Sequence, residues 1–373
     1  MKYYLIAGEA SGDLHASNLL RELRKLDTLA QVRAWGGELL QEQGAEIVKH
    51  YRDLAFMGFT EVIMNLRTIF RNIKFCKEDI LKFKPDAIIL VDYPGFNLRI
   101  AEFAHENNIK VYYYISPQVW AWKQSRVKKI RKVVDKMMVI LPFEKDFYKK
   151  FDFEVDFVGH PLLDAIEQQK EKFQAKEEWK KKFNLKSAPI IALLPGSRTQ
   201  EIIKILPLML TVVDKLPEYQ FVIAAAPSQP MSFYQGLIGT MDIKIVADET
   251  YSLLSASEAA LVTSGTATLE TALLNIPEVV CYKGGKISYN IAKRIVDVKY
   301  ISLVNLVMDR EVVKELIQDE LNENSIFVEL QKILTTEFRK QLFADYSELK
   351  LKLGGSGASK KAAQLIVNNL INI

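Results

Sequence analysis

The feature that most constrains this chain is a regular alternation of short apolar runs with segments of helical periodicity. The runs are KYYLIA, AIILVD and KVYYYI in the first half, then APIIALL, QFVIAAA, IKIVADE, AALVTSG and EVVCYK in the second. Buried strands that alternate with helices are typical of a parallel sheet covered by helices. We therefore predict an α/β protein with two αβα units, each with its own sheet, and ligands in a cleft at the carboxyl ends of the strands.

The length supports two domains, because 373 residues exceed what one ordinary hydrophobic core accommodates. The alternation pauses at FVGHPLLD, residues 157–164, where we place the boundary. We predict an N-terminal domain over 1–164, a second α/β domain over 165–340 and C-terminal helices over 341–373, with helices only after about residue 308. For His160, at the junction, a hinge role or a core hydrogen bond is favoured over catalysis.

Composition excludes several classes of protein. Fifty basic and 46 acidic residues give a net charge of +4, which argues against a dedicated nucleic-acid binder. No apolar stretch reaches the roughly 18 residues of a membrane span, and the N-terminus lacks a secretory signal, so we expect a cytoplasmic protein. Cys76 and Cys281 are far apart, and the acids of FDFEVDFV alternate with apolar residues as in a half-buried strand. We predict no metal site and no cofactor.

Two turns of the first half carry carboxylates. GEASGDLH follows the first strand with Glu9 and Asp13, although a phosphate-binding loop usually repeats glycines and avoids acids. Asp13 is expected to stabilise the start of its own helix. VDYPGFN ends a buried strand with Asp92, which points toward the ligand edge as a candidate general base if burial or Glu9 raises its pKa. Capping of the local turn is the alternative.

Two turns of the second half suit phosphate instead. LLPGSRTQEI places Gly196, Ser197 and Arg198 between a strand and a helix, where backbone N–H groups and a guanidinium can meet one anion. LVTSGTATLE repeats the arrangement, and its members are Ser264, Gly265, Thr266 and Glu270. Glu270 can accept hydrogen bonds from a ribose diol. The alternatives are plain strand-to-helix turns with a solvated Arg198 and a solvated Glu270.

Other segments leave two interpretations open. Cys281 and Tyr282 end a strand beside the same pocket, where main-chain groups can read a base, and Asn305 in YISLVNL is either a structural amide or a ligand contact. In SPQVWAWKQSRVKKIRK, a solvated helix face competes with a local anion site at Lys123 or Arg126. The amphipathic segment 57–83 either packs on the sheet or lies on a membrane surface.

Together, these motifs closely resemble those of the lipid-A-disaccharide synthase family, bacterial glycosyltransferases with two Rossmann-like domains of the GT-B type. The resemblance rests on GEASGDLH, MGFTEV, VDYPGFN, SPQVWAWKQSRVKKI, VGHPLLD, LLPGSR, TSGTATLE, YISLVNL and DREVVKEL, in family order. It implies transfer of a diacylglucosamine unit from UDP-2,3-diacylglucosamine to 2,3-diacylglucosamine 1-phosphate (lipid X), with inversion, release of UDP and no metal. Many family members have a second acid where this chain has Gly95.

The resemblance also implies roles for individual residues. Asp92 is the expected base with Glu9 beside it, Arg198 and Asn305 act around the donor diphosphate, and Glu270 lies near the ribose. The residues expected on the acceptor side are Glu9, Ser11, Gln118, Trp120 and Arg126. Those expected to face the cytoplasmic surface of the inner membrane are Phe59, Val62, Ile63, Leu66, Ile69 and Phe70. For the C-terminal helices over 341–373, two arrangements are compatible with the sequence: they pack back on the N-terminal domain, or they are exchanged in a homodimer.

Two other functions remain open at this point. The same scaffold can carry a UDP-N-acetylglucosamine epimerase or hydrolase, or a UDP-sugar-binding module without catalysis, because a fold does not determine a function. Activity on the soluble nucleotide sugar without a lipid acceptor would favour the first. An unaltered ligand would favour the second.

Overall fold

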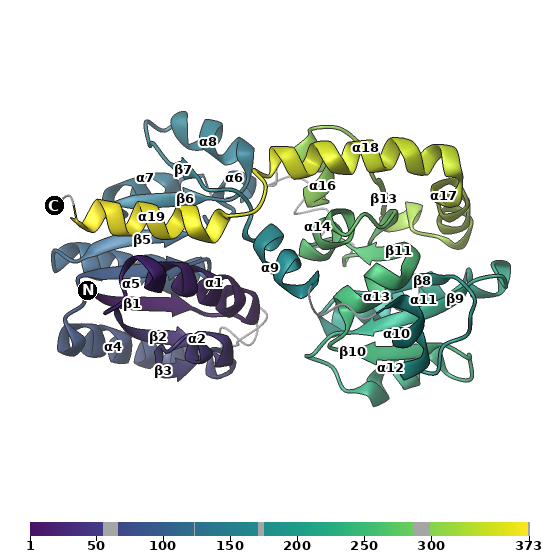
Figure 1. Ribbon diagram of the computed structural model, residues 1–373, viewed down its shortest axis with the longest axis horizontal. Helices are drawn as coiled ribbons and strands as arrows, with labels where there is room; N and C mark the ends of the chain where they lie inside the picture. Colours follow the sequence, from purple (N-terminus) through teal and green to yellow (C-terminus); the bar gives the residue numbers. More distant parts are fainter. Residues whose placement is uncertain (55–65, 123, 171–174, 286–298, 372–373) are drawn as a thin grey trace. The chain divides into compact units, whose positions relative to one another are not determined.

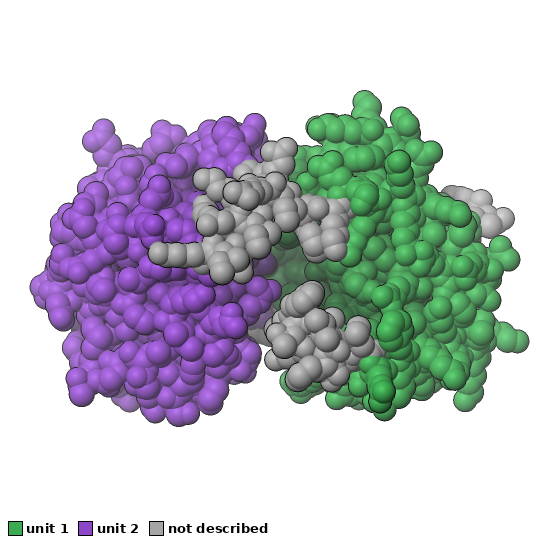
Figure 2. All heavy atoms as spheres, turned by 180° about the vertical axis from the view of Figure 1, so that it is seen from behind, with its two compact units in different colours: residues 1–165, 353–373 green, residues 166–352 purple. Residues whose placement is uncertain are grey.

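The computed structural model describes residues 1–54, 66–122, 124–170, 175–285 and 299–371. They form two compact units (Figures 1 and 2): residues 1–165 with 353–373, and residues 166–352. Each unit is an αβα sandwich around a parallel sheet, and the predicted fold class is confirmed. Among the described helices, none is long and apolar enough to cross a membrane.

The first unit contains a seven-stranded sheet in the order β3-β2-β1-β4-β5-β6-β7. Its strands are β1 (Lys2–Ala7), β2 (Gln31–Gly36), β3 (Glu46–His50), β4 (Ala87–Val91), β5 (Lys110–Tyr114), β6 (Lys136–Val139) and β7 (Asp156–Phe157). Its helices are α1 (Ala10–Leu26), α2 (Glu38–Glu42), α4 (Leu66–Phe83), α5 (Pro94–Glu106), α6 (Val119–Trp122), α7 (Arg126–Val133), α8 (Pro142–Lys149) and α19 (Ala358–Ile371), while α9 (Pro161–Lys170) leads into the second unit.

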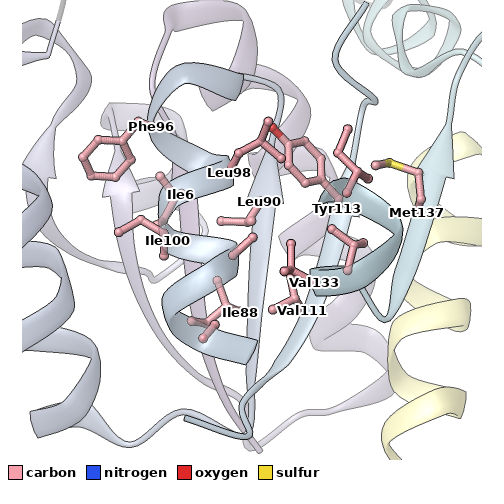
Figure 3. Packing of buried hydrophobic residues seen from close by; sticks show 14 of the residues in the cluster. Ile6, Ile88, Leu90, Phe96, Leu98, Ile100, Val111, Tyr113, Val133 and Met137 are labelled. Carbon is pink, nitrogen blue, oxygen red and sulfur yellow. The ribbon is translucent and has the colours of Figure 1, made fainter. Parts of the chain in front are cut away.

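The sequence explains the two faces of this sheet. Strands β1, β4 and β5 are almost completely apolar and buried, so alternate residues face opposite helical layers. One face packs against α4, α5, α7 and α8, with Ile6, Leu90 and Tyr113 in that core (Figure 3). The other face packs against α1 and α19, so the last helix of the chain completes the first unit.

The second unit contains a six-stranded sheet in the order β10-β9-β8-β11-β12-β13. Its strands are β8 (Ile190–Leu194), β9 (Gln220–Ala225), β10 (Lys244–Ala247), β11 (Ser257–Thr263), β12 (Glu278–Tyr282) and β13 (Lys314–Ile317). Its helices are α10 (Lys176–Lys182), α11 (Thr199–Leu210), α12 (Met231–Ile238), α13 (Thr250–Ala256), α14 (Thr266–Leu273), α16 (Leu303–Met308), α17 (Glu323–Leu334) and α18 (Thr336–Lys352).

Two local expectations are wrong. The segment after residue 308 is not only helical, because β13 forms the edge of the second sheet; with the sequence KELI it is too short and too charged to read as a buried strand. The alternating segment FDFEVDFV is a strand only at its end, Asp156–Phe157, where it pairs with β6. Within the predicted range 341–373, α18 belongs to the second unit, whereas α19 packs back on the first, which is one of the two arrangements expected for these helices.

Candidate active site

Three neighbouring strands of the first unit end in the predicted acceptor residues. In the sheet, β1 lies beside β4 and β4 beside β5, all parallel, so their carboxyl ends share one edge. Glu9 follows β1, Asp92 follows β4, and Ser116 to Trp120 follow β5. Ligands of open α/β sheets bind at this edge.

Asp92 lies in a sharply bent turn. Asp92 and Tyr93 both adopt left-handed conformations, with φ of 46° and 47°, which non-glycine residues seldom do in succession. The carbonyl oxygen of Asp92 accepts hydrogen bonds from Tyr113 Oη at 2.6 Å and from Asn97 Nδ2 at 2.8 Å. These contacts stabilise the bend from the buried side, and left-handed residues held in this way are frequent at active sites.

The environment of Asp92 suits a general base. Burial raises the pKa of Asp92 to about 6, the negative charge of Glu9 adds to this increase, and a hydrogen bond from the Tyr93 backbone opposes it. A carboxyl group with such a pKa is ionised at neutral pH and accepts a proton more readily than an ordinary aspartate. Glu9 itself is exposed at the N-cap of α1, where its side chain makes no capping hydrogen bond.

Gly8 lies where the turn after β1 packs against the turn after β4. The ring of Tyr93 lies directly over Gly8, so a Cβ atom at residue 8 would be 2.4 Å from the ring carbons Cδ1 and Cγ. The glycine therefore allows the turn after β4 to pack against the turn after β1. Gly95, by contrast, has open space around the position of a Cβ, so this turn can accommodate a larger side chain there.

Asp13 lies in the first turn of α1, as expected, but its hydrogen bonds go to another helix. Its buried carboxylate accepts backbone hydrogen bonds from Gly37 at 2.7 Å, Leu39 at 3.1 Å and Leu40 at 3.4 Å. It thus caps the N-terminus of the next helix, α2. Ser11 is exposed near the start of α1. Of the acids in GEASGDLH, only Glu9 remains available to a ligand.

The segment after β5 presents a mixture of buried and exposed groups. Ser116 is buried, Gln118 is exposed, and Trp120 is half-buried with its ring edge-on to Phe143 at 4.9 Å between centroids. Arg126, half-exposed, begins α7. Lys123 and the side chain of Trp122 lie outside the described residues.

In the second unit, the two phosphate-compatible turns follow adjacent strands. Gly196 has a φ of +107°, and Arg198 is the N-cap of α11, 71% exposed, with a 3.3 Å ion pair to Glu201. The carbonyl of Ser197 accepts a hydrogen bond from Ser228 Oγ at 2.7 Å. An exposed guanidinium at a helix N-terminus, with one weak partner, can turn toward an anion at low cost.

The neighbouring turn lies at the start of α14. Gly265 is the N-cap with a φ of +154°, and Thr266 is exposed. Ser264 is anchored, because its hydroxyl donates to the Ile301 carbonyl at 2.9 Å and its N–H to the Cys281 carbonyl at 3.2 Å. Gly265 and Thr266 are therefore better placed than Ser264 to offer groups to a diphosphate.

Glu270, one turn further along α14, has a partner that sequence patterns did not indicate. The Tyr251 hydroxyl donates to Glu270 Oε1 at 2.7 Å, which leaves Oε2 to accept from a ligand. Burial raises the pKa of Glu270, and the hydrogen bond from Tyr251 opposes that increase. Tyr251 lies on another helix, 19 residues away, so no local spacing could have revealed it.

Two predicted donor contacts need correction. Cys281 is fully buried, and burial raises the pKa of its thiol. Its carbonyl oxygen already accepts a hydrogen bond from the Ser264 N–H. Of the two residues, only the half-buried Tyr282 reaches the surface at the end of β12. Asn305 lies in α16 and is fully buried. Its Oδ1 accepts from the N–H groups of Val312 and Val313, and its Nδ2 donates to Val313 O and Glu315 Oε1, all at 2.7 to 3.0 Å. Asn305 is a structural amide, because these bonds use both ends of its side chain.

The predicted membrane-facing residues are described only in part. Phe59, Val62 and Ile63 lie outside the described residues, as does the side chain of Leu66. Ile69 is wrongly assigned, because it packs against the core of the first unit. Phe70 lies on the outer face of α4, 55% exposed, with Arg99 at 5.2 Å over its ring. Among the described residues, no group of His, Cys, Asp or Glu is placed to hold a metal ion.

Comparison with known proteins places this architecture. Two solved structures resemble it over almost their whole length: UDP-GlcNAc 2-epimerase from Neisseria meningitidis (TM-score 0.70, 16% identity, 100% of both chains) and the glycotransferase of kitacinnamycin (TM-score 0.65, 11% identity, 99% of both chains). At such low identity they define the fold alone. The chain is a two-domain α/β protein of the GT-B class.

Sequence comparison is more specific. The family model described as lipid-A-disaccharide synthetase matches residues 3–368. The lipid-A-disaccharide synthase of Syntrophus aciditrophicus is 39% identical over 96% of this chain and 95% of the relative, and that of Trichlorobacter lovleyi is 38% identical over 98% and 96%. The chain belongs to the lipid-A-disaccharide synthase family.

Proposed function

We propose that the protein joins UDP-2,3-diacylglucosamine to lipid X, giving the β-1,6-linked lipid A disaccharide 1-phosphate and UDP. Membership of the family over residues 3–368 supports the reaction. The observation that carries the mechanism is the half-buried Asp92, held in its bent turn beside Glu9 with a pKa of about 6.

In this mechanism the first unit binds the acceptor. Asp92 takes the proton from the 6-hydroxyl of lipid X while the hydroxyl oxygen attacks the anomeric carbon of the donor. The bond from that carbon to the UDP oxygen breaks, so the configuration inverts and the electron pair leaves with UDP. Glu9 raises the basicity of Asp92 and can bind sugar hydroxyls, and Gln118, Trp120 and Arg126 complete the acceptor side.

The second unit binds the donor and stabilises the leaving group. Arg198 and the N-termini of α11 and α14 supply positive charge to the diphosphate as its negative charge increases. Glu270, oriented by Tyr251, accepts hydrogen bonds from the ribose diol. Tyr282 lies at the end of the adjacent strand, where the base would bind.

We further propose that the protein acts as a peripheral enzyme at the cytoplasmic surface of the inner membrane, because both substrates carry acyl chains. Segment 59–70 is the docking region of this proposal, with Phe70 as its described apolar contact. We also propose a homodimer. Within this chain, α19 packs against α1 of the same unit.

The mechanism is tested with an Asp92→Asn variant, purified protein and both lipid substrates, following UDP release with and without a chelator. We expect the variant to bind UDP normally, whereas its kcat should fall about 10²- to 10⁴-fold, which is the usual contribution of a general base. An Asp152→Asn variant, which changes an exposed acid, is the control and should retain full turnover.

Several results would contradict this proposal. Near-normal turnover of Asp92→Asn removes Asp92 as the base, and a strict metal requirement contradicts the proposed leaving-group chemistry. Conversion of UDP-N-acetylglucosamine without an acceptor would identify an epimerase or hydrolase instead.

A further inference from the structure

The segment 116–120, which we assign to the acceptor, packs against helix α8. Ser116 Oγ and Tyr148 Oη form a buried hydrogen bond of 2.6 Å, and the Trp120 ring packs edge-on against Phe143. Both ends of the segment therefore rest on one helix, and the exposed Gln118 lies between them.

A buried carboxylate lies in the first turn of α8. Glu144 is 1% exposed and accepts backbone hydrogen bonds from Leu141 at 2.9 Å and Ile140 at 3.1 Å, so it caps the start of α8. The helix that it caps carries Phe143 and Tyr148, the two side chains that contact Trp120 and Ser116. Glu144 thus acts on both ends of segment 116–120 through the start of α8.

We propose that Glu144 is a positioning residue for the acceptor: its carboxylate fixes the start of α8, from which Phe143 and Tyr148 hold Trp120 and Ser116, and thereby Gln118, in the conformation that binds the acceptor sugar. This inference rests on the proposed function, because it takes segment 116–120 to contact the acceptor. Glu144 is buried and acts only through its neighbours.

The charge of Glu144 changes in the physiological range. Burial raises its pKa to about 7, against the opposing backbone hydrogen bonds from Leu141 and Ile140. A protonated carboxyl loses acceptor capacity, so it caps the start of α8 less well. We therefore expect segment 116–120 to loosen as the pH falls through about 7.

Nearby titratable groups do not replace this charge. On the adjacent strands, Lys136 of β6 and Asp156 of β7 pair with each other at 3.3 Å. Tyr148 and Tyr113 are buried, and burial raises the pKa of both hydroxyls, so they stay neutral. The main influences on the Glu144 pKa are burial and hydrogen bonds.

The first test compares kinetics across pH. Because about one tenth of Glu144 is ionised one pH unit below its pKa, the wild-type KM for the acceptor should rise up to about tenfold between pH 8 and pH 6. In Glu144→Gln the amide oxygen preserves the helix cap but cannot ionise, so this dependence of KM should disappear while that of kcat remains. Tyr148→Phe should raise the acceptor KM several-fold with kcat retained. The matched control is Tyr3→Phe, which removes another largely buried hydroxyl, bonded to Asp27, from the same unit.

The second test does not need turnover. Trp120 fluorescence should titrate near pH 7 in the wild type and lose this transition in Glu144→Gln, with Trp120→Phe identifying the signal. If the wild type lacks transferase activity, the proposed function fails, and fluorescence still reports whether Glu144 controls the segment. An unchanged pH dependence of both KM and fluorescence in Glu144→Gln overturns the inference, as does a normal acceptor KM in Tyr148→Phe.

Discussion

Tyr251 holds Glu270 by a 2.7 Å hydrogen bond between two helices of the second unit. If Glu270 binds the ribose diol, loss of this bond should misorient the carboxylate without removing it. We expect Tyr251→Phe to raise the KM for the UDP donor about three- to tenfold, the effect of one hydrogen bond, with kcat little changed. Tyr346→Phe removes a buried hydroxyl bonded to Ile276 in the same unit and should leave KM unchanged. Equal effects in both variants would exclude a specific role for Tyr251.

The charge of Glu9 predicts a shift in the pH profile. Turnover should fall about tenfold per pH unit below the Asp92 pKa of about 6. Because Glu9 raises that pKa, Glu9→Gln should move the acidic limb to lower pH, whereas Glu154→Gln, at an exposed acid, should not. A shift to higher pH, or none, would contradict the coupling between Glu9 and Asp92.

The same raised pKa has a consequence for stability, with a defined sign. The folded state holds the Asp92 proton more tightly than the unfolded chain does. The contribution of this group to stability is therefore full below its ordinary pKa and is lost as the pH rises through about 6. The unfolding free energy of Asp92→Asn, measured by urea titration at several pH values, should therefore lack this pH dependence.

Asn305 should affect stability and not donor binding. Its removal leaves the buried N–H groups of Val312 and Val313 without their acceptor, so Asn305→Ala should lose about 2 to 4 kcal/mol of unfolding free energy. Asn322→Ala, which removes an exposed N-cap of α17, should lose only about 1 kcal/mol. A normal unfolding midpoint with a raised donor KM would restore Asn305 to the binding site.

Phe70 provides a test of membrane docking. Loss of one inserted phenylalanine should cost about 1 to 2 kcal/mol, so Phe70→Ser should weaken binding to anionic phospholipid vesicles about five- to thirtyfold. Leu351→Ser, at a residue 80% exposed in the second unit, is the matched control and should bind as the wild type does. Unchanged sedimentation of Phe70→Ser with vesicles would argue against this face.

The strands that position the candidate site were predictable, whereas its side-chain partners were not. Strands such as β1, β4, β8 and β11 have buried apolar sequences that end at recognisable turns, so the strand ends that carry Glu9 and Asp92 in the first unit and Arg198 in the second followed from the pattern. By contrast, Asp13 caps a different helix and Tyr251 reaches across from another one. Such partners depend on packing between distant segments, which periodicity does not record.

The return of α19 to the first unit determines the order in which the chain can fold during synthesis. Residues 166–352 form a continuous insert whose whole sequence emerges from the ribosome before residues 353–373. The second unit can therefore fold while the first still lacks Ala362, Ala363 and Ile366, which cover the apolar face of α1. Domains generally fold as units during synthesis. Although it begins at the N-terminus, the unit that we assign to the acceptor is thus the last to be completed.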